Sequence, residues 1–135
     1  MFSYILFDLD GTVSDPKAGI TGSVQYALRA LGIEEPDLDR LEPFIGPPLR
    51  DSFQEYYNLN EEQTEFAVKK YRERFCAKGI YENILYPGMK ELLNRLKESG
   101  CHLAVASSKL EVSVTEILRY FAIGDCFEVT VGSEP

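Results

Sequence analysis

Three short runs of apolar residues, one at the N-terminus and two in the last third of the chain, predict β-strands. They read FSYILF, CHLAVA and CFEVTV, and each is too short for a helix and ends or begins beside a charged residue or a glycine. We expect strands near residues 2–8, 101–107 and 126–131. Since the first two runs are almost continuously apolar, we expect the first strand to be buried and the second to be buried on both faces.

Between these runs, apolar residues recur every three or four positions, as they do on the buried face of a helix. Asp15 and Pro16 are residue types favoured at the N-cap and the first helical position, so they predict the start of one helix. Asn60 followed by Gln63 resembles a capping box and predicts the start of another. Residues 34–79 contain no convincing strand pattern.

The order of these elements predicts the fold class. One strand is followed by a long helical stretch and then by alternating helices and strands, which predicts an α/β protein with a parallel sheet. We therefore expect a Rossmann-like α/β core formed by residues 1–15 and 81–135, with residues 16–80 inserted as an all-helical cap domain. Ligands of open α/β sheets bind at the carboxyl ends of the strands, so an insertion directly after the first strand is placed to cover a site.

Composition narrows the functional classes. The chain has 135 residues, 44% of them hydrophobic and 27% charged, which is typical of a globular protein. Its formal net charge of -8 argues against a nucleic-acid partner, which needs clustered lysine and arginine. We expect no membrane partner either, because no apolar stretch approaches a membrane span. Three widely spaced cysteines without a Cys-x-x-Cys pair, together with the absence of a basic leader, predict a cytoplasmic protein.

The segment Asp8-Leu9-Asp10-Gly11-Thr12 carries the strongest chemical signal. Two carboxylates one residue apart at the end of a strand can both face one ligand, and Gly11 allows the backbone to turn sharply. One carboxylate can attack phosphorus, and the other can protonate the leaving oxygen and then activate water. The alternative is a simple Asp-Gly turn. We favour the catalytic interpretation, because charges that directly follow an apolar strand need a reason.

This pentapeptide resembles the first motif of the haloacid dehalogenase superfamily, whose phosphatases carry Asp-x-Asp-Gly-Thr. The resemblance implies that Asp8 is the nucleophile and Asp10 the general acid/base. It also implies a magnesium ion held by the Asp8 carboxylate and the Asp10 backbone carbonyl, with Leu9, Gly11 and Thr12 near the phosphate.

The second motif of that superfamily is a serine or threonine that ends the next core strand and contacts the phosphate. Ser107 matches it, since it follows CHLAVA directly. Ser108 is expected to offer a backbone N–H group at the start of the following helix, which is a natural anion site. Lys109 has two interpretations of equal weight: a cation beside the phosphate, or a solvated lysine at a helix start.

Within the helical insertion, the segment from Ile45 to Arg50 (IGPPLR) resembles the substrate-specificity loop of phosphoglycolate phosphatases and bacterial 5′-nucleotidases. Arg50 is the candidate substrate residue, because a guanidinium can clamp a carboxylate or phosphate when a cap closes. The alternative, with similar weight, is a surface arginine paired with Asp51 or other nearby acids. His102 lies within a predicted strand without a matching ligand, and we interpret it as structural.

Together these features predict a magnesium-dependent phosphatase that hydrolyses a small phosphorylated metabolite, such as phosphoglycolate or a nucleoside monophosphate, through an aspartyl-phosphate. A phosphomutase of the same superfamily and a non-catalytic phospho-accepting or binding module are the alternatives. The resemblance also implies a third-motif lysine and a fourth-motif acidic magnesium ligand after Pro135, so we expect these 135 residues alone to be a fragment with weak activity or none. The identity of the phosphate ester and the oligomeric state stay open.

Overall fold

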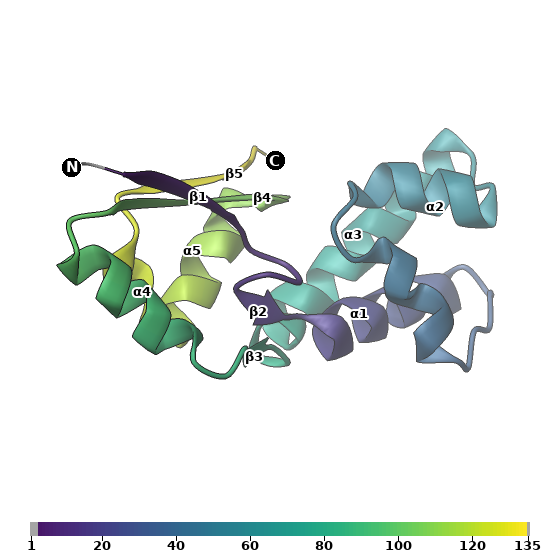
Figure 1. The fold of residues 1–135 in the computed structure, drawn as a ribbon. Helices are drawn as coiled ribbons and strands as arrows, with labels where there is room; N and C mark the ends of the chain where they lie inside the picture. Colours follow the sequence, from purple (N-terminus) through teal and green to yellow (C-terminus); the bar gives the residue numbers. More distant parts are fainter. Residues whose placement is uncertain (1–2, 135) are drawn as a thin grey trace. The chain divides into compact units, whose positions relative to one another are not determined.

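The structure, a computed structural model, describes residues 3–134 and divides into two compact units (Figure 1). The core unit contains the chain up to Asp15 and again from Ile84, and the helical unit is Pro16–Asn83. No helix within residues 3–134 has the length and apolar character needed to cross a membrane.

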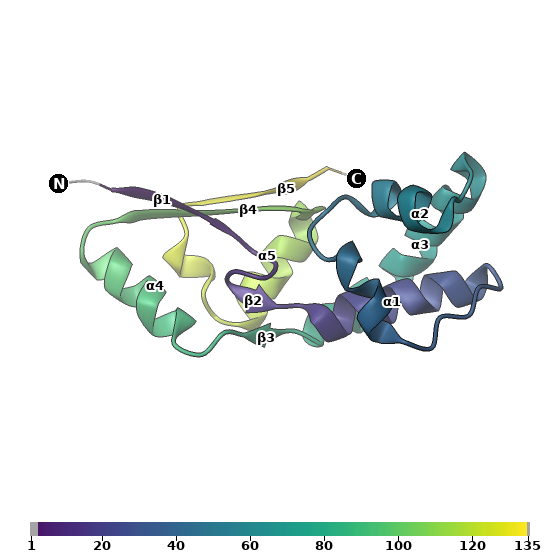
Figure 2. The same ribbon diagram turned by 45° about the vertical axis from the view of Figure 1, so that its right-hand side comes forward.

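A three-stranded parallel sheet forms the centre of the core unit. Strands β1 (Tyr4–Asp8), β4 (His102–Leu110) and β5 (Val129–Ser133) lie in the order β1-β4-β5. Helices α4 (Met89–Glu98) and α5 (Glu111–Tyr120) both lie on the same side of this sheet (Figures 1 and 2). The expectation of an α/β fold with a parallel sheet is confirmed.

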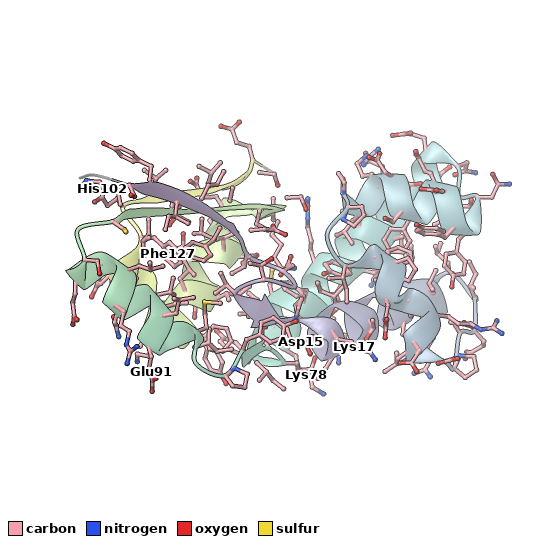
Figure 3. The ribbon with its side chains drawn as sticks, viewed as in Figure 1. Asp15, Lys17, Lys78, Glu91, His102 and Phe127 are labelled. Carbon is pink, nitrogen blue, oxygen red and sulfur yellow. The ribbon has the colours of Figure 1, made fainter. Side chains whose placement is uncertain are left out.

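Only one face of the sheet is buried over the described residues, so the expectation of fully buried strands was wrong. Side chains alternate between the two faces of a strand, and in β1 Tyr4 and Leu6 are 79% and 70% exposed. The opposite face is packed: the ring of Phe7 meets Phe127 edge-on at 6.1 Å, and Leu103 of β4 is buried. Figure 3 shows Phe127 between the sheet and its helices. The one-sided burial follows from both helices packing on one face.

The ends of two strands also differ from the expectation. β4 continues to Leu110 instead of ending at residue 107, and β5 begins at Val129 rather than 126. A register shift between Ala106 and Leu110 interrupts the pairing of β4 with β5. Polar residues therefore continue a strand that the apolar pattern ends too early, and Cys126 belongs to a short 3-10 helix, η3 (Gly124–Cys126).

A second, two-stranded sheet was not expected. Strand β2 (Ser14–Asp15) pairs antiparallel with β3 (Ile84–Leu85), and each strand borders one of the two places where the chain passes between the units. Asp15 is thus a strand residue, and the N-cap position of α1 (Lys17–Ala30) is held by Pro16, one residue later than the sequence pattern predicts. Two-residue strands are too short to leave a periodic pattern in the sequence.

The helical unit contains α1, α2 (Leu49–Tyr57) and α3 (Glu61–Ala77), with 3-10 helices η1 (Leu38–Phe44) and η2 (Gly79–Tyr81). The capping box at α3 is confirmed: the Asn60 side chain accepts from Gln63 N at 2.8 Å, and Gln63 Oε1 accepts from Asn60 N at 3.0 Å. Arg74 of α3 donates to Ser23 of α1 and to Glu82, which ties the end of the unit to its first helix.

Candidate active site

The register of β1 and β4 brings the first and second candidate motifs to one edge of the sheet. Asp8, the last residue of β1, pairs with Ala106, which directly precedes Ser107. The carboxyl ends of parallel strands meet at the same edge. Residues far apart in the sequence therefore become neighbours, as a shared phosphate site requires.

The loop after β1 is wound around one carbonyl group. Leu9, whose side chain is fully buried, accepts backbone hydrogen bonds through its oxygen from Thr12, Val13 and Ser14 at 3.3, 3.0 and 3.2 Å. Gly11 has a φ of +81°, which glycine adopts without strain, and its N–H group donates to Ser14 O at 2.8 Å. The N–H groups of Gly11 and Thr12 thus have partners inside the loop, and Leu9 can offer a ligand only its backbone.

The two carboxylates have different environments. Asp8 is exposed at the end of β1, where a ligand can reach it. The Asp10 side chain is only 4% exposed, and its Oδ2 lies 3.0 Å from Lys109 Nζ. Its other oxygen, Oδ1, is buried and has no hydrogen-bond partner among residues 3–134. The structure therefore distinguishes an accessible carboxylate from a sheltered one held by a cation.

The structure contradicts the interpretation of Lys109 as a solvated lysine at a helix start. It is not a solvated lysine, since its side chain is 11% exposed, and it is not at a helix start, since α5 begins at Glu111. Its ammonium pairs with Asp10, a residue of the other motif. No local pattern could have revealed this contact, because it depends on how β4 lies beside β1.

The two serines are both strand residues. Ser107 Oγ accepts a hydrogen bond from Lys109 N at 3.1 Å, which leaves its own O–H group able to donate to an anion. Ser108 is exposed and lies within β4, so the expectation that it starts a helix was wrong. The reason is the longer strand: β4 runs three residues beyond Ser107, to Leu110, before α5 begins.

Two oxygen donors in this loop fit a magnesium ion. Mg²⁺ prefers oxygen ligands, keeps several waters and is commonly held by one or two carboxylates together with the phosphates of a substrate. The exposed Asp8 carboxylate and the Asp10 backbone carbonyl are donors of this kind, two positions apart. Across residues 3–134 no group of three or more His, Cys, Asp or Glu side chains could hold a metal. Two protein oxygens would leave the other positions around the ion to water and to substrate oxygens.

Arg50 lies in the first turn of α2 in the helical unit, after a loop in which Gly46 has a φ of +106°. Its side chain is 42% exposed, and its guanidinium pairs with Glu65 at 2.9 Å and with Glu61. The pairing with nearby acids expected as an alternative is thus present, with residues of α3 as the partners.

The family model described as haloacid dehalogenase-like hydrolase matches residues 5–135. A 5′-nucleotidase of Pseudomonas aeruginosa is 53% identical over 130 residues, which are 96% of this chain and 59% of that protein. A tyrosine-protein kinase, PtkA, of Mycobacterium tuberculosis is 38% identical over 129 residues, covering 96% of this chain and 44% of that protein. A phosphoglycolate phosphatase of Aquifex aeolicus is 32% identical over 130 residues, covering 96% of this chain and 60% of that protein.

Among solved structures, the crystal structure of a predicted phosphatase from Clostridium acetobutylicum superimposes with a TM-score of 0.96 at 47% identity. The match covers 99% of this chain and 62% of that one. The chain therefore spans less than two thirds of the proteins that it resembles here. Its fold, its first motif and the family match agree, and the chain belongs to the haloacid dehalogenase-like hydrolase family.

Proposed function

We propose that the protein containing this chain is a magnesium-dependent phosphatase that hydrolyses a small phosphomonoester through an aspartyl-phosphate on Asp8. The observation that carries this proposal is the pair of unlike carboxylates: Asp8 is exposed at the end of β1, whereas Asp10 is sheltered and held by Lys109. Nucleophilic catalysis needs a carboxylate that the substrate can reach. General acid catalysis needs one whose position is fixed.

The proposed reaction has two displacements at phosphorus. In the first, an oxygen of Asp8 bonds to phosphorus, the bond to the ester oxygen breaks, and Asp10 gives its proton to that oxygen, so that the alcohol leaves. In the second, Asp10 takes a proton from water, the water oxygen bonds to phosphorus, and the bond to Asp8 breaks to release phosphate. Asp10 thus ends each cycle with the proton that it lost.

The phosphate contacts of the proposal come from both strands. The hydroxyl of Ser107, the residue that follows Ala106, the register partner of Asp8, would donate to a phosphoryl oxygen. Ser108 and the backbone of Leu9, Gly11 and Thr12 surround the same edge. The Gly11 and Thr12 N–H groups would reach a phosphate only if the loop released their present hydrogen bonds.

The proposed magnesium ligands in this chain are the Asp8 carboxylate and the Asp10 backbone carbonyl. A bound Mg²⁺ ion would offset the negative charge of the phosphoryl oxygens during the displacement. Without that positive charge, the anionic Asp8 and the anionic substrate would repel each other.

We further propose that the helical unit serves as the cap that selects the substrate, with Arg50 as its contact to an anionic group. Arg50 must leave Glu61 and Glu65 to do so. Ion pairs between exposed side chains contribute only about 0–1 kcal/mol, so an incoming phosphate or carboxylate can displace them at little cost.

The free Cys76, Cys101 and Cys126 fit a reducing compartment, and we infer a cytoplasmic location.

The test is a phosphate-release panel on the protein at its full encoded length, with and without magnesium. The panel includes phosphoglycolate, nucleoside monophosphates and sugar phosphates. We expect magnesium-dependent release from at least one ester. Asp8→Asn should abolish it and Asp10→Asn should lower kcat by about 10²–10⁴-fold, the usual contribution of a general acid/base. The control Asp125→Asn, on an exposed 3-10 turn of the core unit, should retain full activity. Unchanged turnover in Asp8→Asn would refute the proposal.

A second candidate is transfer of the phosphoryl group to an acceptor other than water, as in a phosphomutase. The relative named as a tyrosine-protein kinase makes this worth testing. Both reactions begin with the same attack by Asp8, and they differ in what enters the second displacement. Incubation with a sugar phosphate, or with a nucleotide and a tyrosine-containing peptide, distinguishes them: a phosphorylated acceptor would favour transfer, and free phosphate alone would favour hydrolysis.

A further inference from the structure

We propose that Lys109 is a positioning residue that holds Asp10 by one carboxylate oxygen and thereby selects the other as the oxygen that exchanges protons during turnover. This inference rests on the proposed function, since it assigns a role within the same acid/base step. It differs from both interpretations of Lys109 given by the sequence, a cation in direct contact with the phosphate and a solvated lysine.

The contact itself is close and sheltered. Lys109 Nζ lies 3.0 Å from Asp10 Oδ2, and the two side chains are 11% and 4% exposed. Asp10 Oδ1 is buried and lacks a hydrogen-bond partner in the part of the chain that the structure describes. A buried polar atom without a partner is costly and calls for an explanation, such as a catalytic role. A substrate oxygen or a water that meets Oδ1 would supply the missing hydrogen bond.

The fold holds the Lys109 backbone from two sides. Ser107 Oγ accepts its N–H group at 3.1 Å. On the other side Gly132 packs so closely that an added Cβ would be 2.8 Å from Lys109 O. The cation is therefore carried by a fixed strand segment and not by a mobile loop, which is the property that a positioning residue needs.

The ion pair between Lys109 and Asp10 makes a direct contact between Lys109 and a phosphate unfavourable. If the ammonium turned towards a phosphate, Asp10 would be left as a sheltered carboxylate without its counter-charge, which is strongly unfavourable. If the pair stays intact, Oδ2 stays occupied and only Oδ1 can give a proton to the leaving oxygen or take one from water. In this scheme Lys109 orients Asp10 and takes no part in proton transfer.

The test compares two esters that need the general acid to different degrees. An alkyl phosphate that the wild-type protein hydrolyses has a leaving oxygen that must be protonated, whereas 4-nitrophenyl phosphate releases a stable anion. The measured quantity is kcat/KM, which reports the step in which the ester bond breaks. We expect Lys109→Met to lower kcat/KM about 10²-fold for the alkyl ester, as for loss of a general acid, and less than about 10-fold for the nitrophenyl ester.

Two further variants make the comparison specific. Lys109→Arg retains a cation that can reach Asp10 and should recover most of the activity on the alkyl ester. Lys90→Met removes an exposed lysine of α4 and should change neither ester. Thermal unfolding of each variant identifies one that fails to fold. If Lys109→Met does so, Lys109→Gln replaces it in the same comparison.

The outcomes separate this inference from the proposed function. Equal losses on both esters would overturn the positioning role and indicate that Lys109 contacts the phosphate. Unchanged kcat/KM on both esters would overturn it as well. If instead the wild-type protein hydrolyses no ester, or if Asp8→Asn remains active, the proposed function itself fails.

Discussion

Gly132 of β5 lies directly against the backbone of Glu111, the first residue of α5. A Cβ atom added at Gly132 would be 2.4 Å from Glu111 Cα and 2.6 Å from Glu111 N. Real Cβ atoms do not approach backbone atoms so closely, and backbone cannot move aside as a flexible side chain can. The last strand and the start of the last helix therefore pack through a glycine, next to the segment that carries Lys109.

Gly132→Ala should destabilise the core unit. Overfilling a well-packed site costs about 1–3 kcal/mol, and here the obstructing atoms belong to the backbone. Urea unfolding of the wild type and the variant measures the difference in free energy. Gly124→Ala is the matched control, because its Cβ would meet only Leu118 Cβ, at 4.0 Å. We expect the control to stay within about 0.5 kcal/mol of the wild type. Equal stabilities of the two variants would contradict the close packing.

A corresponding contact exists within the helical unit. A Cβ added at Gly19 of α1 would lie 2.2 Å from Gly79 O, so Gly19→Ala should destabilise this unit, even though alanine is favoured over glycine in helices by about 1 kcal/mol. For Gly22→Ala, three residues along the same helix, the three atoms nearest to the added Cβ all belong to the guanidinium of Arg74, the nearest at 3.1 Å. That side chain can shift, so this variant should be neutral or more stable. Thermal unfolding of both variants makes the comparison, and a stabilising Gly19→Ala would count against the contact.

Removing the capping box of α3 is expected to lower stability by a measurable amount. Asn60→Ala removes the acceptor for the Gln63 N–H group and should cost about 1 kcal/mol. Asn60→Asp keeps an acceptor at the same position and adds a negative charge at the helix N-terminus, where the helix dipole favours it. We expect Asn60→Asp to retain or exceed wild-type stability in chemical denaturation. A similar loss in both variants would show that the side-chain acceptor is unimportant.

The lowered pKa of Glu73, in α3, is expected to make the stability of the fold depend on pH. The Tyr26 hydroxyl donates to Glu73 and, with the ammonium of Lys70, holds the pKa of Glu73 below its ordinary value. A carboxyl group with a lowered pKa stabilises the fold above its ordinary pKa, and this contribution is lost as the pH falls through the lowered value. Tyr26→Phe removes the larger cause and should move the pKa upward.

NMR titration of the Glu73 carboxyl carbon measures this shift directly. Tyr56→Phe, a substitution of an exposed tyrosine in the same unit, is the control and should leave the Glu73 titration unchanged. If Tyr26→Phe leaves the pKa of Glu73 where it was, the hydroxyl is not its cause.

Much of the candidate site could be predicted from the sequence, because its first motif is local. Asp8 and Asp10 stand two positions apart, directly after an apolar run, so any strand that ends there presents them together. The position of Ser107 beside Asp8 could also be expected, since parallel strands present their carboxyl ends at one edge. The capping box at Asn60 is equally local, and it is present as expected.

What only the tertiary structure decided are the contacts between residues far apart in the sequence. The ion pair of Asp10 with Lys109 depends on the register of β4 against β1 and on the extra residues of β4, which no apolar pattern marks. The one-sided burial of the sheet depends on where α4 and α5 pack. Periodicity reports which residues of an element are apolar, but which of its faces is covered, and by what, is settled only when the elements come together.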